Sequence, residues 1–283
     1  MKHSLRFVLA VLFLLSGAYA QQKTIEVQGP YTLILLGQRL NQLYQRQQPL
    51  VNVRVHSGNI RTALSSLHAG EIDIAQAQGS LGADELRGLV AVPVGVEGIV
   101  FYVHESNPLS ELTIAQLRSI YTGQILNWKQ LGGPDQRILL FGGESTTGIG
   151  SFFSESVLRG DDTFGYENRA STKALLETIA RNPSGIGFAS LDFAPHVKIL
   201  RIRASDGEPA VDPSFVNIRS LKYPVARYVY WYFSRKPQGA LKDFCHWIFS
   251  SEGQLVVESV GFQPLMPEQR AASLRKLGIA EDR

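Results

Sequence analysis

A repeated alternation of short strands and amphipathic helices restricts the fold of this chain more than any other feature. Alternating apolar and polar residues predict strands at 24–27 and 51–55, and a short apolar run predicts a third at 72–75. Apolar residues at helical spacing fill both intervals, from Leu33 to Tyr44 and from Ile60 to Leu67. This order predicts an α/β fold in which helices cover a mostly parallel sheet.

A polar loop follows each of these strands. The loops span residues 29–32, 57–59 and 76–80 and are built from small and polar residues. Open α/β sheets bind ligands at the carboxyl ends of their strands. We therefore expect these loops to meet at one ligand site.

A further strand and loop, within Phe141–Leu158, have the composition of an anion site. The apolar run 138–141 predicts a buried strand, and Phe152, Phe153 and Val157 follow the loop at near-helical spacing. The amides at a helix start lack intrahelical partners and favour negative charge. Glycines and hydroxyls that could approach such a ligand are Gly148, Gly150, Ser145, Thr146, Thr147 and Ser151. An ordinary capped helix after a turn would have a similar composition.

The first twenty residues have the three parts of a cleavable secretory signal. Lys2 and Arg6 give the positive start, Phe7–Leu15 the apolar core, and Ala18–Ala20 an A-x-A cleavage site. Without Lys2 and Arg6, the 28 basic residues fall to 26, against 25 acidic ones. We expect a periplasmic mature chain that begins at Gln21, has no membrane span, and has no nucleic acid as a partner.

The motifs of common hydrolases and metal sites are absent from the sequence. Cys245 is the single cysteine, which excludes an internal disulfide, and its helical context predicts a buried structural thiol. A serine-hydrolase elbow needs G-x-S-x-G, but Thr147 stands at the last position, and no H-E-x-x-H occurs. We therefore expect that the protein is not an enzyme and that it binds neither a metal nor a cofactor.

Two segments near the C-terminus are described by their composition. Tyr223–Phe233 is rich in aromatic residues, which would suit a stacking surface, but its alternation favours a packed strand. The charged segment from Glu268 to Arg283 is expected to fray.

The loop after Phe141 resembles the phosphate-binding loop of the periplasmic phosphate-binding proteins of ABC importers, which usually reads G-R-E-S-G-S-G-T-x-x-F-F. Matching positions are Gly142, Glu144, Ser145, Gly148, Phe152 and Phe153. Gly143 stands where the family has arginine, and Ile149 where it has threonine. The resemblance extends to the three amino-terminal loops, to the T-G-x-I-x-x-W turn at 122–128, to the strand at 185–189, and to the Y-P-x-x-R strand at 223–233.

This resemblance implies a two-lobed type II periplasmic binding protein. Each lobe would be a mixed, mostly parallel sheet flanked by helices, and crossover strands near 99–103 and 198–233 would join the lobes. The implied division is a signal peptide at 1–20, a first lobe at 21–99 and 198–283, and a second lobe at 100–197.

The resemblance also implies which residues bind the ligand. Donors to an oxyanion would come from Thr32, Ser57, Ser145, Thr147 and Gly148. Well-characterised members have an aspartate near position 78, whereas this chain has Gln78, which can both donate and accept. His56 and Arg61 flank the second loop and are either charge partners that replace the missing arginine or solvated surface residues.

The implied function is a solute-binding protein that captures phosphate or a related oxyanion for an ABC importer. Its partners would be a small oxyanion and the importer permease, and we expect a monomer. The alternative is an extracytoplasmic sensor or protein-interaction module of the same fold that lacks high-affinity phosphate binding.

Overall fold

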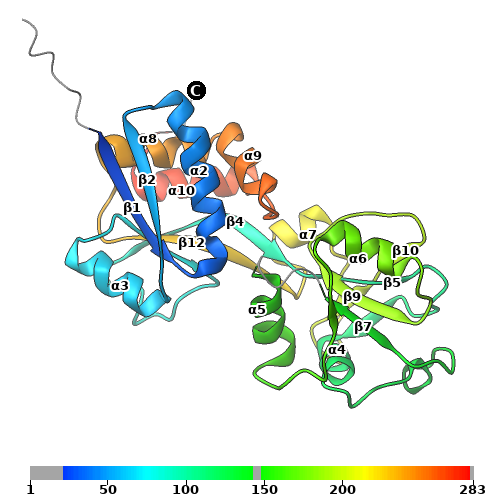
Figure 1. Cartoon of the computed structure of the whole chain (residues 1–283). Coiled ribbons are helices and arrows are strands. Elements are labelled where there is room, and N and C mark those ends of the chain that lie inside the picture. The colour runs from blue at the N-terminus through cyan, green and yellow to red at the C-terminus, as the bar shows by residue number, and fades with distance from the viewer. Residues whose placement is uncertain (1–21, 143–147, 281–283) are drawn as a thin grey trace, which may run out of the picture.

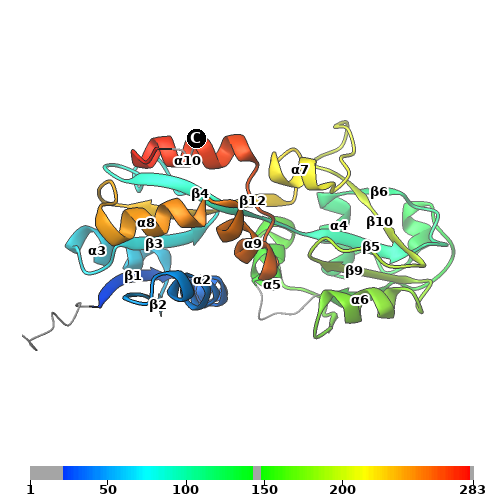
Figure 2. The ribbon, with the colours of Figure 1, turned by 90° about the horizontal axis from the view of Figure 1, so that it is seen from above.

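The computed structural model describes residues 22–142 and 148–280, which form two α/β lobes side by side (Figure 1). Each lobe contains one five-stranded sheet with helices against it, and the same division is visible from above (Figure 2). The predicted fold class, two lobes of mixed sheets flanked by helices, is confirmed.

The sheet of the first lobe has the order β2-β1-β3-β12-β4. Its strands are β1 (Lys23–Gly29), β2 (Val51–Ser57), β3 (Ile74–Gln78), β4 (Val90–Gly98) and β12 (Ala226–Phe233). The first three run parallel, as their alternation with helices predicts, while β12 is antiparallel to both of its neighbours. Parallel pairing therefore places the ends of β1, β2 and β3 at one edge of the sheet.

Helices cover both faces of this sheet. They are a 3₁₀ turn (Tyr31–Leu33) continued by α2 (Ile34–Gln47), then α3 (Ile60–Ala69), α8 (Gly239–Ile248), α9 (Ser251–Ser259) and α10 (Pro267–Leu277). The side chain of Asn59 caps α3 by accepting from the amide of Thr62, which satisfies one amide at the helix start. Cys245 on α8 is completely buried, so the predicted structural thiol is confirmed.

The expectation that the charged C-terminal segment frays is wrong for residues 268–280. Pro267 occupies the first turn of α10, where its missing amide is no loss. Leu274, Leu277 and Ile279 are buried in the core, with Leu277 only 1% exposed. These apolar residues anchor a helix whose outer face carries the charges.

The sheet of the second lobe has the order β10-β5-β9-β7-β8. Its strands are β5 (Val100–His104), β7 (Leu139–Gly142), β8 (Glu167–Asn168), β9 (Gly185–Ala189) and β10 (Val197–Ile199), and a separate pair joins β6 (Glu111–Thr113) to β11 (Arg201–Arg203). The helices are α4 (Ile114–Tyr121), a 3₁₀ turn (Trp128–Leu131), α5 (Ile149–Phe153) with a π-helical continuation (Ser154–Leu158), and α6 (Thr172–Ile179). The short helix α7 (Phe215–Arg219) contacts β4 of the first sheet.

Two segments connect the lobes. Only Ile99 separates β4 from β5, although these strands belong to different sheets, and β12 returns to the first sheet. Trp231, Tyr232 and Phe233 are buried, so the aromatic run is a packed strand as predicted. The lobe boundaries remain a prediction, and the pairing of β11 with β6 favours a return after Arg203, later than residue 198.

An aromatic cluster fixes the helix that begins after the glycine loop. Phe153 of α5 stacks on Phe188 with ring centroids 3.9 Å apart, and Tyr121 packs edge-on against both rings. The Tyr121 hydroxyl donates to the carbonyl of Phe141 at 3.1 Å, at the end of β7. The end of β7 and the helix α5 are thus held against the same aromatic cluster.

Candidate functional site

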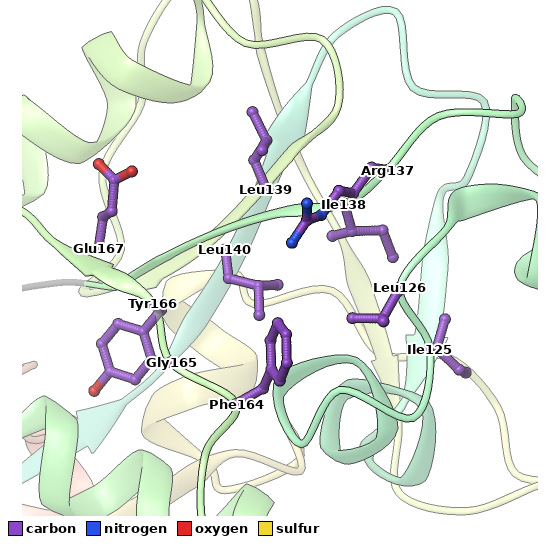
Figure 3. Close-up of a pocket in the computed structure, with 10 residues that line it drawn as sticks. All are labelled: Ile125, Leu126, Arg137, Ile138, Leu139, Leu140, Phe164, Gly165, Tyr166 and Glu167. Carbon is purple, nitrogen blue, oxygen red and sulfur yellow. The ribbon is translucent and has the colours of Figure 1, made fainter.

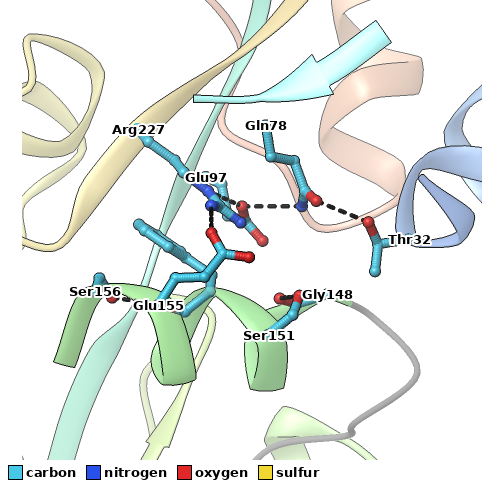
Figure 4. Close-up of polar contacts among 9 residues, drawn as sticks. Thr32, Gln78, Glu97, Gly148, Ser151, Glu155, Ser156 and Arg227 are labelled. Carbon is cyan, nitrogen blue, oxygen red and sulfur yellow. Dashed lines mark hydrogen bonds and ion pairs between the residues drawn. The ribbon is translucent and has the colours of Figure 1, made fainter. Parts of the chain in front are cut away.

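Thr32, Gln78 and Gly148 come together at the gap between the lobes (Figure 4). The Thr32 hydroxyl donates to Oε1 of Gln78 at 2.7 Å. Gly148 approaches from the other lobe so closely that a Cβ atom there would lie 2.9 Å from Cβ of Thr32 and 3.0 Å from Nε2 of Gln78. Three of the residues selected from sequence therefore meet, although they come from distant loops.

The local structure at position 148 requires glycine. Gly148 has a φ of +81°, which residues with a side chain rarely adopt, and it immediately precedes α5. The next residue, Ile149, is 7% exposed and belongs to the core. In this chain position 149 is thus a packing position.

Gln78 is held at both ends of its amide. Its Oε1 accepts from Thr32, and its Nε2 donates to Oε2 of Glu97 at 3.0 Å. The amide nitrogen of Gln78 can only donate, so the Oε2 atom of Glu97 that accepts from it orients this nitrogen toward Glu97. The carbonyl oxygen therefore lies on the side of Thr32.

Glu97 pairs with Arg227 across adjacent strands. The two residues lie opposite each other in the antiparallel register of β4 and β12, and Nε of Arg227 donates to Oε2 of Glu97 at 2.8 Å. Glu97 is 4% exposed, and this burial raises its pKa to about 7, with Arg227 opposing the shift and Glu155 adding to it. Oε1 of Glu97 and Nη2 of Arg227 are buried and have no hydrogen-bond partner among the described residues.

Arg227 also contacts the second lobe. Its Nη1 donates to Oε2 of Glu155 at 2.5 Å, and its guanidinium carbon lies 3.9 Å from the ring centroid of Phe152. Figure 4 shows Arg227 and Glu155 facing each other, and the carboxylate of Glu97 between Arg227 and Gln78. A continuous polar chain thus runs from Thr32 through Gln78, Glu97 and Arg227 to Glu155.

Sequence reasoning did not select Glu97 or Arg227 for the site. Each is a charged residue inside an otherwise apolar strand, Val92–Val103 and Tyr223–Phe233 respectively. Charges in such strands are rarely buried unless they are paired. The opposite charges of Glu97 and Arg227, each within an apolar run, could therefore have indicated a buried ion pair.

The other predicted site residues are not brought to this cluster by any contact in the described part of the chain. Ser57 ends β2 beside Gly29 and is exposed. Nε2 of His56 lies 2.6 Å from Oε2 of Glu26, so the imidazole belongs to an exposed pair on the first lobe. Arg61 is exposed in the first turn of α3. Ser145 and Thr147 lie outside the described residues.

A separate pocket lies entirely on the second lobe (Figure 3). Leu126 and Leu140 point toward Phe164 in its interior, whereas Glu167 points away. None of the predicted ligand residues lines it; the lining residues are Ile125, Leu126, Arg137, Ile138, Leu139, Leu140, Phe164, Gly165, Tyr166 and Glu167. Its mainly apolar walls do not suit a small oxyanion.

The described residues contain neither a helix that could span a membrane nor a cluster of side chains that could hold a metal. Within residues 22–142 and 148–280, no helix is long and apolar enough to cross a bilayer. The same part of the chain contains no cluster of three or more His, Cys, Asp or Glu side chains arranged to hold a metal.

Comparison with known proteins identifies the family. The sequence profile of the PBP superfamily domain matches residues 17–252. The chain belongs to this superfamily. The phosphate-binding protein PstS of Pseudomonas aeruginosa is 24% identical over 83% of this chain and 81% of its own length, and that of Bacillus subtilis is 26% identical over 78% and 74%.

Solved structures agree on the fold of this PBP superfamily member. A "possible phosphate binding protein" from Planctomyces limnophilus has a TM-score of 0.80 at 21% identity, with 91% of this chain and 98% of that chain covered. The structural similarity to this protein supports the two-lobed fold of the chain.

Proposed function

We propose that this protein is a periplasmic solute-binding protein that captures phosphate or a related oxyanion for an ABC importer, and that it is not an enzyme. The observation that carries the proposal is the meeting of Thr32 and Gln78 of one lobe with Gly148 of the other. The relatives from Pseudomonas aeruginosa and Bacillus subtilis, whose name is phosphate-binding protein, support it.

The chemistry of these residues suits a small oxyanion. Thr32 supplies a hydroxyl, Gln78 supplies an oriented amide, and the glycine at position 148 lets backbone approach where a side chain would collide. Hydrogen bonds to a charged group contribute about 1.5–3 kcal/mol each, so a few converging donors are enough for micromolar or tighter binding. Closure of two lobes around the ligand would remove it from water and strengthen these bonds.

Titration calorimetry of the chain from Gln21 with phosphate, sulfate and molybdate tests the proposal. We expect phosphate to bind and Thr32→Val to weaken binding about tenfold or more, because the site would lose the hydroxyl that either donates to the ligand or holds the amide of Gln78 in place. Thr24→Val is the matched control, since Thr24 lies in β1 of the same lobe and outside this cluster. Absence of binding to all three anions by the unmodified protein would refute the proposed function.

A further inference from the structure

Arg227 has contacts in both lobes. It belongs to β12 of the first sheet, where Glu97 fixes its Nε atom at 2.8 Å. Arg227 also contacts Glu155 at 2.5 Å and the ring of Phe152 at 3.9 Å, and both residues belong to the helical segment that follows Gly148. The guanidinium therefore spans the gap between the lobes.

We propose that Arg227 is a positioning residue that latches the lobes together, with Phe152 and Glu155 as the surface that receives it. This inference rests on the proposed function, because it assigns the latch to the closed, ligand-holding state. Arg227 acts through lobe position rather than through contact with the ligand.

The guanidinium suits this role. Its flat face stacks on an aromatic ring while its edge donates to carboxylates, so one side chain makes three contacts in fixed geometry. Glu97 holds Arg227 within the first lobe and leaves one edge and one face directed at the second lobe. Both cross-lobe contacts exist only while the lobes are close.

The latch is connected to the binding loop. The Glu97 oxygen that accepts from Arg227 also accepts from Gln78, and Gln78 in turn accepts from Thr32. A ligand that orders Thr32 and Gln78 would therefore also order the carboxylate that aims Arg227. Closure and ligand capture share one hydrogen-bonded chain.

In the opposite interpretation, Arg227 binds the ligand and Glu155 competes with the ligand for it. The contacts favour the latch, because Arg227 bonds to the partner of Gln78 rather than to Gln78 or Thr32. The stacking on Phe152 also brings the lobes together without any carboxylate. The two interpretations predict opposite changes in affinity when Glu155 loses its charge.

The test compares Glu155→Gln and Phe152→Leu with a matched control, Glu177→Gln. Glu177 is an exposed glutamate on α6 of the same lobe. We expect phosphate dissociation, measured by stopped flow, to become roughly three- to tenfold faster in both latch variants and to stay unchanged in the control. Thermal unfolding of each variant separates a local effect from a loss of folding.

A second readout needs no ligand. Spin labels at Gln38→Cys on α2 and Lys173→Cys on α6 report the distance between the lobes, because both positions are exposed and the native Cys245 is buried. We expect Glu155→Gln and Phe152→Leu to shift the ligand-free protein toward longer distances. Arg227→Lys, which keeps the charge but loses the flat face, should give an intermediate shift.

These measurements separate the latch from the proposed function. If the unmodified protein bound none of phosphate, sulfate and molybdate, the proposed function would fail, and the shift in the distance between the lobes would still test the latch. Tighter phosphate binding by Glu155→Gln would overturn the latch, since Glu155 would then be a competitor. Unchanged distances in both latch variants would overturn it as well.

Discussion

Gly148 packs against Thr32 across the gap between the lobes, in a backbone conformation that glycine adopts and other residues avoid. Two independent constraints thus act on this position: the positive φ and the missing room for a side chain. Each would be violated by a single methyl group.

We expect Gly148→Ala to weaken phosphate binding at least tenfold, because the methyl group would hold the lobes apart at Thr32 and Gln78. An alanine at this positive φ would also strain the backbone of the folded protein by about 1–2 kcal/mol. Gly160→Ala is the matched control, since Gly160 has a φ of +89° and no atom within 4 Å of the added Cβ. Calorimetry with phosphate measures the difference, and equal affinities for the two variants would contradict a cross-lobe contact at Gly148.

The stability of the protein should fall as the pH rises from about 4.5 to about 7. Burial raises the pKa of Glu97 to about 7 from its ordinary value of 4.5, so in this window the folded chain holds a proton that the unfolded chain has released. The contribution of this proton to the free energy of unfolding that is lost by pH 7.5 is about 3 kcal/mol, at 1.36 kcal/mol per pKa unit. Arg227 and Gln78 oppose this rise in the pKa of Glu97, and the charge of Glu155 adds to it.

Denaturant unfolding at pH 5 and pH 7.5 measures the slope of the free energy of unfolding against pH. In Glu97→Gln the slope should be smaller, because the amide has no proton to lose and its oxygen can still accept from Arg227. Glu177→Gln should keep the slope of the unmodified chain. An unaltered slope in Glu97→Gln would show that another group titrates in this window.

Restoring the arginine of the family should increase phosphate affinity. A bidentate guanidinium introduced by Gly143→Arg could contribute about 1.5–3 kcal/mol, which is roughly tenfold to a hundredfold in Kd. Residue 143 lies outside the described residues, so this expectation comes from the sequence resemblance alone. Titration calorimetry measures it, and unchanged affinity with the fold intact would indicate that the site has been remade for another ligand.

The variant Gly143→Arg should be tested without Ile149→Thr, although the family has threonine at that position. Ile149 is 7% exposed within the core, so a hydroxyl there would replace buried apolar contacts and cost about 1–2 kcal/mol of stability. A combined variant would confuse a gain in binding with a loss of folding.

Export should remove the first twenty residues. The positive start, the apolar core and Ala18–Ala20 predict a mature chain that begins at Gln21, two residues before β1 starts at Lys23. Mass spectrometry of the protein from a periplasmic fraction would measure its first residue. Recovery of intact Met1 in the cytoplasm would contradict the predicted localisation.

The sequence was sufficient for much of the fold because its signals are local. Strict alternation marks β2, helical spacing marks α3, and both are formed by neighbouring residues. The same reasoning placed Thr32 and Gln78 at the ends of strands, and the parallel register then brought their loops to one edge.

The charges of the site could not be found in the same way. Arg61 and His56 were candidates because they lie near Ser57 along the chain, whereas Arg227 lies opposite Glu97 across two strands that are far apart in sequence. Strand pairing of this kind depends on topology, which periodicity does not reveal. The fraying expected for the C-terminal segment failed for a related reason, because charge composition conceals the apolar face of Leu274 and Leu277.

The strand order of the first lobe also has a consequence for how the protein folds. In that sheet β4 is bonded only to β12, among the described strands, and β12 begins at Ala226, more than a hundred residues after β4 ends at Gly98. A nascent chain that stops before Ala226 therefore cannot complete the sheet, however much of the second lobe it contains. Pairings between such distant segments slow folding, because a long loop must close before any contact stabilises it. The first lobe is consequently the last part of the protein that can acquire its native structure.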